Sequence, residues 1–266
     1  TALDWYDAPD PRPDYYRNLP SYFYMDNTDY NRRNFAKYAW AKEAWETDLP
    51  STTHINWDRL YAVNSLNSTA SGNRSKYVIE ERRVDQNDLN FAVNAKWNPV
   101  KFLTVNGGLS YKWNRTEYYK ILDDLLGGDY YVNIDQFAER DFAAYPTMIQ
   151  NDLDYYLRNG AAQTLAQGDK YGYDYYAHVR RAEAWASGRF TFGGFEATVA
   201  GRLGYSKFWR EGLLRKGLFP GLDDNGNPFT YNGEVITKYD QIDGRPITSK
   251  GESDKKDFLT GSGKIN

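Results

Sequence analysis

Hydrophobic and polar residues alternate along five segments of the chain. The first two segments read DLNFAVNAKW and LTVNGGLSYKWN, and their apolar positions are Leu89, Phe91, Val93, Ala95 and Trp97, then Leu103, Val105, Gly107, Leu109, Tyr111 and Trp113. A period of two places such residues on one face of a β-strand. We therefore predict an antiparallel hairpin over residues 85–118, with a short turn at 98–101.

A second hairpin is predicted over residues 176–211. The segments RAEAWASGRFTF and FEATVAGRLGYSKFW alternate in the same way, and Gly193-Gly194 between them is a tight-turn signal. A fifth strand begins within residues 255–266, where Phe258 opens a new alternating run. The sequence therefore indicates an all-β fold built as an antiparallel meander.

Long connections separate these hairpins, over residues 1–80, 119–175 and 212–254. Helix-spaced apolar residues follow Phe35, and residues 133–159 read as one or two short helices interrupted at Pro146. The opening stretch, ALDWYDAPDPRPDYYRNLPSYF, holds four prolines among six aromatic residues. Since proline blocks helix interiors and sheet ladders, we expect an ordered loop there, neither a helix nor a central strand.

Three features favour a transmembrane β-barrel over a soluble β-sandwich. The apolar face is rich in small residues, among them Gly107, Ala184 and Gly201, which would leave a sandwich core poorly packed. Charged residues lie deep on the opposite face, as a wet lumen allows. Aromatic residues lie at the strand ends, about 25 Å apart in height at the usual barrel tilt. We expect part of a barrel wall, with short turns at one end and long, partly helical extracellular loops at the other.

Composition excludes several other classes of protein. The chain has no cysteine and a net charge of −3, so thiol chemistry is ruled out and no nucleic-acid partner is expected. The two histidines, His54 and His178, show no metal-ligand spacing. DDNGNP resembles half of a calcium loop, but a turn on Asn225-Gly226 fits it better. We predict that the protein is not an enzyme and needs no metal or cofactor.

Four segments carry a family resemblance: WYDAPDPRPDYYRNLPSY, INWDRLYAVN, GRLGYSKFWREG and DFLTGSGKIN, in this order. The chain resembles the C-terminal barrel of TonB-dependent outer-membrane receptors, of the long-looped type found in anaerobic Gram-negative bacteria. The resemblance implies a barrel of about 22 strands in the outer membrane, which imports a scarce nutrient. It also implies that the TonB energy-transducing complex drives uptake through a plug domain. The plug and most of the barrel are missing here, so we expect the chain to be a piece of a longer protein.

The nutrient would be a glycan, a peptide or a metal chelate, held by aromatic and polar groups of the loops. Our candidate ligand-binding residues are Trp5, Tyr15, Tyr16 and Tyr130. Outer-membrane lipid is the expected partner of the apolar face, and a surface lipoprotein is a further candidate partner. The alternatives are a soluble β-sandwich that binds carbohydrate and a passive porin.

Overall fold

The computed structural model describes residues 1–24 and 34–266 and divides the chain into two compact units. Unit 1 comprises residues 1–81, 122–132 and 164–169, and unit 2 comprises 82–121, 133–163 and 170–266. Two long strands, β4 (Tyr77–Val100) and β5 (Leu103–Asp124), contribute residues to both units.

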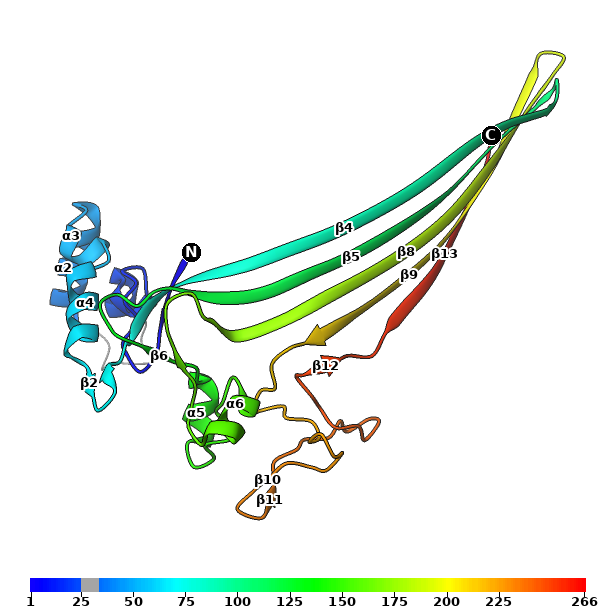
Figure 1. Ribbon diagram of the computed structural model, residues 1–266. Helices are drawn as coiled ribbons and strands as arrows, with labels where there is room; N and C mark the ends of the chain where they lie inside the picture. The colour runs from blue at the N-terminus through cyan, green and yellow to red at the C-terminus, as the bar shows by residue number, and fades with distance from the viewer. Residues whose placement is uncertain (25–33) are drawn as a thin grey trace. The chain divides into compact units, whose positions relative to one another are not determined.

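Unit 2 is dominated by one curved antiparallel sheet (Figure 1). Its long strands neighbour each other in chain order: β4 (Tyr77–Val100), β5 (Leu103–Asp124), β8 (Lys170–Phe192), β9 (Phe195–Gly212) and β13 (Lys256–Ile265). The short β12 (Gly251–Glu252) also pairs with β9, at its far end. The predicted antiparallel meander is therefore confirmed. Within the described residues the sheet is open and does not close on itself.

The strands are longer than the alternation predicted. The first hairpin spans residues 77–124 and the second 170–212, against the predicted 85–118 and 176–211. Inter-strand hydrogen bonds continue past the apolar stripe, because a ladder needs only backbone groups and not an apolar face. The sequence-based boundaries were wrong here for that reason.

Both tight turns lie at the same end of the sheet, as predicted. The backbone N–H of Thr191 donates to the carbonyl of Phe102 over 2.9 Å, which places the end of β8 beside the first turn. At the other end, Gly212 is paired with Tyr175, where the connection 213–250 begins. Short and long connections therefore alternate between the two ends of this sheet.

One face of the sheet is apolar and exposed. Leu109, Val199 and Leu203 expose 63%, 47% and 62% of their surface. No second layer of the described chain covers them, which confirms the expectation that this face is not a protein core.

The long connection of unit 2 contains the two predicted helices on either side of Pro146. They are α5 (Gln136–Phe142) and α6 (Leu153–Asn159), capped by the carboxylates of Asp135 and Asp152. Each carboxylate accepts backbone N–H groups that the first helical turn leaves unpaired.

The connection 213–250 is largely irregular and contains the short pair β10 (Thr230–Tyr231) and β11 (Glu234–Val235). The predicted turn at Asn225-Gly226 is present. Oδ1 of Asp223 accepts the backbone N–H groups of Asn225 and Asn227 over 2.9 and 2.7 Å, so this carboxylate serves the turn itself.

Unit 1 holds most of the helices. They are η1 (Tyr16–Asn18), α1 (Pro20–Tyr24), α2 (Phe35–Glu46), α3 (Pro50–Thr53) and α4 (Trp57–Leu66). Its short strand pairs are β2 (Ser68–Thr69) with β3 (Gly72–Asn73) and β6 (Tyr131–Val132) with β7 (Thr164–Leu165). In the described part of the chain, no helix has the length and apolarity required to cross a membrane.

The opening stretch corrects one expectation in detail. Its first residues form β1 (Ala2–Trp5), which pairs with the start of β4, and Pro20 begins helix α1 instead of interrupting a loop. Proline is well tolerated in the first helical turn, where its missing N–H would have no partner. Residues 6–15, with Pro9, Pro11 and Pro13, are irregular as predicted.

The core of unit 1 forms around Leu60, Tyr77 and Leu126. Beside it, Asn64 is fully buried and every polar atom of its side chain is used. Its amide nitrogen donates to the carbonyls of Tyr77, Leu125 and Leu126 over 2.7, 2.9 and 3.1 Å. Its oxygen accepts the backbone N–H groups of Lys76 and Tyr77 over 2.8 and 3.1 Å. Asn64 thus joins α4 to β4 and to residues 125–126.

Candidate functional site

The opening stretch is fixed to the start of β4 by side chains on both sides. The hydroxyl of Tyr77 donates to the carbonyl of Pro9 over 2.9 Å, and Nζ of Lys76 contacts Oδ2 of Asp7 over 2.9 Å. Within the stretch, Arg12 donates to the carboxylate of Asp10 over 2.6 Å. Prolines reduce the entropy lost on ordering such a segment, so few contacts suffice to hold it.

A cavity of about 380 Å³ lies between this stretch and the helices of unit 1. We call it the opening pocket. Its lining combines proline and aromatic surfaces with polar and charged groups: Pro9, Asp10, Pro11, Arg12, Pro13, Asn18, Phe23, Trp40, Ser51, Thr52, His54, Asn56, Arg59, Leu60 and Tyr77. Cavities of this size and mixed lining are typical of sites for small ligands.

Local capping positions the helices that contribute these side chains. Oδ1 of Asn34 accepts the N–H of Lys37 over 2.9 Å and begins α2, which carries Trp40. Oδ1 of Asn56 accepts the N–H of Arg59 over 2.9 Å and begins α4. Pro50 occupies the first turn of α3. The sequence therefore sets where each helix starts, and with it which side chains face the cavity.

The charges of the opening pocket are partly paired. Burial opposes ionisation of Asp10, but the hydrogen bonds and charge of Arg12 outweigh it and hold the pKa of Asp10 below its ordinary value. Burial raises the pKa of Tyr77, which keeps its hydroxyl a donor to Pro9. Within the described residues, Arg59 forms no ion pair. The pocket therefore offers an unpaired cation next to flat apolar surfaces.

None of the four predicted ligand-binding residues lines the opening pocket, but Trp5 contacts Arg12, which does. It packs against the core of unit 1, and the guanidinium of Arg12 lies over its ring at 5.1 Å. Since Arg12 lines the cavity, Trp5 supports the pocket from behind instead of lining it.

Tyr15 and Tyr16 begin a chain of edge-on aromatic contacts. Their ring centroids are 4.8 Å apart, and Tyr16 lies 5.7 Å from Tyr22, which lies 5.5 Å from Phe23. Phe23 lines the pocket, so this chain reaches it only at its last member.

Tyr130 belongs to another part of unit 1. Its hydroxyl is 2.8 Å from Oγ1 of Thr69, and its carbonyl accepts the N–H of Ser75. The structure therefore does not group Tyr130 with the opening pocket.

The two histidines lie in different units and make ordinary contacts. Nδ1 of His54 is 3.0 Å from Oγ1 of Thr53, and Nε2 of His178 is 2.9 Å from Oε2 of Glu211. Among the described residues, no group of three or more acidic, histidine or cysteine side chains could hold a metal ion.

Sequence reasoning missed Arg59 and the role of Trp40 in the opening pocket. Trp40 lies on the helix expected after Phe35, but it lines the cavity and exposes 54% of its surface instead of packing in a core. The available signal was a tryptophan among alanines and charged residues in a helix without a distinct apolar stripe.

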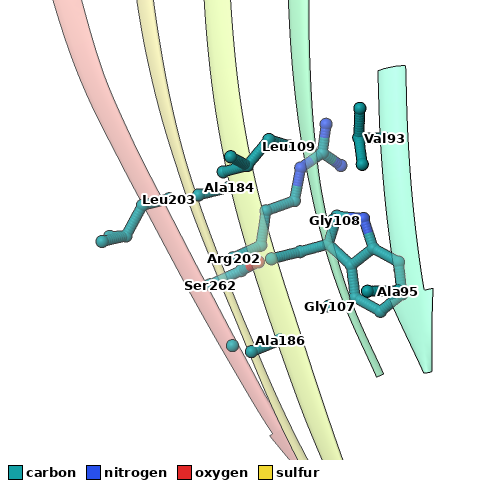
Figure 2. Close-up of a pocket in the computed structure, with 12 residues that line it drawn as sticks. Val93, Ala95, Gly107, Gly108, Leu109, Ala184, Ala186, Arg202, Leu203 and Ser262 are labelled. Carbon is teal, nitrogen blue, oxygen red and sulfur yellow. The ribbon is translucent and has the colours of Figure 1, made fainter. Parts of the chain in front are cut away.

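A second hollow crosses the sheet of unit 2 and measures about 610 Å³ (Figure 2). All five long strands contribute to it, and half of its lining residues are glycine or alanine: Val93, Ala95, Gly107, Gly108, Leu109, Ala184, Trp185, Ala186, Gly201, Arg202, Leu203 and Ser262. The space stays open because glycine and alanine side chains are too short to fill the gaps between neighbouring strands. Trp185 lies on the opposite face, between the polar residues Glu183 and Ser187 of β8.

Comparison of the chain with protein-family models, curated proteins and solved structures finds no match. We therefore argue function from the opening pocket and from the two faces of the sheet.

Proposed function

We propose that this chain is part of the wall of an outer-membrane nutrient receptor of a Gram-negative bacterium, with the opening pocket on its extracellular loops. One observation carries the proposal: the apolar face of a five-stranded meander is exposed along its length. Soluble proteins rarely leave so large an apolar patch in water. Lipid chains would cover it without a second protein layer.

The dimensions of the apolar stripe support this assignment. On β9 the stripe runs from Phe195 to Tyr205, and both residues are exposed. Ten strand steps span about 33 Å, which a barrel tilt reduces to about 25 Å of height. This is the height of the apolar band in outer-membrane barrels.

The opposite face of the same strands is polar, as a lumen requires. Glu183 on β8 pairs with Arg202 of the neighbouring strand and with Arg181. The arginine side chains of these pairs are about half exposed, which a water-filled lumen accommodates. A sandwich would instead bury one face against a second sheet.

The long connections support a receptor over a passive porin. They carry helices, ordered turns and a defined cavity. A pore for passive diffusion needs none of these features. Binding residues commonly lie on loops held by a rigid scaffold. In this proposal the TonB complex supplies the energy through a plug domain outside this chain, and a surface lipoprotein is a candidate partner of the loops.

Cysteine scanning tests the proposal directly, because this chain contains no cysteine, and any cysteine elsewhere in the full-length protein is first replaced by serine. Leu109→Cys and Leu203→Cys report on the apolar face, and Ser110→Cys and Ser262→Cys report on the polar face. Each variant of the full-length protein is reconstituted in lipid vesicles, labelled with a nitroxide and exposed to oxygen or to a water-soluble nickel complex. We expect oxygen to relax the first pair more strongly and nickel the second.

Nickel access at all four positions would identify a soluble protein and refute the proposal. Loss of access at Leu109 and Leu203 to both relaxing agents would reveal a protein core on the apolar face. Dissipation of the proton-motive force then separates an energised receptor, whose uptake stops, from a passive porin, whose uptake continues.

A further inference from the structure

The apolar face of the sheet changes character in rows toward the end that carries the long connections. Residues paired across β5, β8, β9 and β13 form these rows. One row is apolar: Leu109, Ala184, Leu203 and Gly261. The next row is aromatic and aliphatic: Tyr111, Ala182, Tyr205 and Leu259. The row after that introduces cations: Trp113, Arg180, Lys207 and Asp257.

Consecutive rows lie two residues apart along each strand, which is about 7 Å. The first cations therefore lie a single row beyond the aromatic edge of the apolar stripe. On β8 and β9 the other end of the stripe is formed by Phe190, Phe192, Phe195 and Ala197. The two ends of the stripe differ in charge.

Arg180 is held at this border by two tryptophans. Its guanidinium lies 4.8 Å from the ring centroid of Trp113 and 5.1 Å from that of Trp209. Its Nη1 donates to the carbonyls of Asn114 and Val179 over 2.8 and 3.0 Å. These contacts fix the guanidinium on the sheet surface without neutralising its charge.

The next row adds Arg115, which is paired across the sheet with His178. The guanidinium of Arg115 lies 4.3 Å over the ring of Tyr176. His178 stacks on Trp209 with ring centroids 4.7 Å apart and contacts Glu211 through Nε2. Glu211 is thus occupied by the histidine.

Arg115, Arg180 and Lys207 outnumber Asp257 and Glu211, whose carboxylates no lysine or arginine of the described residues neutralises, and leave a surplus of positive charge on this face. Within the described chain, neither Arg115 nor Arg180 nor Lys207 forms an ion pair with a carboxylate. Lys255 is paired with Glu252 over 2.7 Å. Asp257 lies opposite Lys207 in the ladder and is the acidic member of the Arg180 row.

We propose that Arg180 and Lys207 of this row, with Arg115 of the next, bind the phosphate groups of anionic membrane lipids, with the tryptophans at headgroup depth. The inference rests on the proposed function, because it needs the apolar stripe to face lipid. Arginine binds phosphate through parallel N–H groups, and indoles favour the boundary between acyl chains and headgroups. Cations next to an apolar stripe are complementary to a lipid that is apolar below and anionic above.

The test compares two double variants of the full-length protein, purified in a neutral detergent. Arg180→Gln with Lys207→Gln removes two cations from the proposed row. Lys112→Gln with Arg181→Gln is the control and removes two cations at the same height from the opposite face. Lys112 and Arg181 are paired with each other in the ladder, next to the pair of Trp113 and Arg180. Neighbouring residues of a strand point to opposite faces. Lys207→Gln alone is the second variant if the first double variant fails to fold.

Native mass spectrometry measures the lipid retained from phosphatidylcholine, from phosphatidylglycerol and from bisphosphorylated lipid A. Each cation near an anionic surface contributes about fivefold in affinity, so we expect the first double variant to bind anionic lipid roughly thirtyfold more weakly. The control variant should bind as the natural protein does. Loss with lipid A alone would identify a glycolipid phosphate as the natural occupant, and equal loss with both anionic lipids would identify lipid phosphate in general.

Equal loss in both double variants, or no loss in either, would overturn the inference. So would an acidic protein that co-purifies through Arg180 while lipid retention is unchanged. The nitroxide experiment at Leu109 and Leu203 keeps the outcomes apart: if these sites face lipid and anionic lipid is not retained, only the phosphate site is wrong. If they face water, the proposed function fails with it.

Discussion

The indole of Trp185 on β8 occupies the space that a side chain at Gly108 of β5 would need. A Cβ atom at Gly108 would lie 2.4 Å from Nε1 of Trp185 and 2.3 Å from Oδ1 of Asn94. The two residues are directly opposed in the ladder. A glycine at this position therefore allows the tryptophan to lie over the neighbouring strand on the polar face.

Gly108→Ala should displace Trp185 and destabilise the sheet by about 1–3 kcal/mol, the usual cost of overpacking. Urea unfolding in detergent measures the free energy, and fluorescence of a 5-fluorotryptophan at position 185 reports the displacement. Gly201→Ala is the matched control, because no heavy atom lies within 4 Å of its added Cβ. Equal stability of the two variants would show that Trp185 moves aside without cost.

Asn64→Leu should destabilise unit 1 by on the order of 3 kcal/mol. The substitution keeps the side-chain size but leaves several buried backbone groups at Tyr77 and Leu126 without partners. Hydrogen exchange of residues 57–80 measures the change. Leu66→Ala in the same helix is the control, since Leu66 exposes 81% of its surface. Protection that survives Asn64→Leu would mean that water replaces the lost bonds.

Acid should loosen the connection 213–250 through Asp154. Arg215 and Lys250 contact the carboxylate of Asp154 over 2.8 and 2.7 Å. Burial opposes its ionisation, but the Lys250 hydrogen bond and the Arg215 charge outweigh burial and hold its pKa below the ordinary 3.8. A lowered pKa stabilises the fold above pH 3.8, and this contribution is lost as the pH falls through the lowered value.

Pepsin cleavage of residues 213–250 as a function of pH measures this loss. Asp154→Asn should expose the connection at neutral pH, with hydrogen exchange roughly tenfold faster. Asp224→Asn is the control: Asp224 also contacts Arg215, but its side chain is 98% exposed. If residues 213–250 are as well protected in Asp154→Asn as in the natural protein, contacts other than those of Asp154 stabilise the connection.

Ligand binding should depend most on the opening pocket. Trp40→Ala should weaken binding of the transported glycan, peptide or chelate by about 2 kcal/mol, or roughly thirtyfold, as for an aromatic anchor that the ligand covers on binding. Trp5→Ala should act through Arg12, and Tyr15→Ala and Tyr16→Ala through the aromatic contacts that end at Phe23, so we expect smaller losses. Tyr130→Ala tests the remaining candidate.

Isothermal titration of the full-length receptor with each ligand class measures these affinities, and detergent-resistant migration in gels checks assembly. Unchanged affinity in Trp40→Ala together with a loss in Tyr130→Ala would move the site away from the opening pocket and toward Thr69.

The alternation of side chains determined a large part of unit 2 from sequence alone. Residues such as Leu109 and Leu203 were assigned to the exposed face, and the turn at Gly193-Gly194 was placed, because the side to which a strand residue points depends only on its position in the strand. The break at Pro146 and the turn at Asn225-Gly226 were equally local. Strand ends were not, since backbone pairing continues without an apolar pattern.

Only the tertiary structure decided which distant residues meet. Asn64 reaches the carbonyl of Leu126 across 62 positions of sequence, and Arg180 reaches Trp113 across a strand pairing. The opening pocket likewise combines Arg12, Trp40 and Arg59 from three separate segments. No local pattern carries these contacts, because they arise when packing and hydrogen bonding bring separate segments together. The sequence identified the aromatic residues of the loops as candidates for ligand binding. Only the tertiary structure showed which of them line a cavity and which support it.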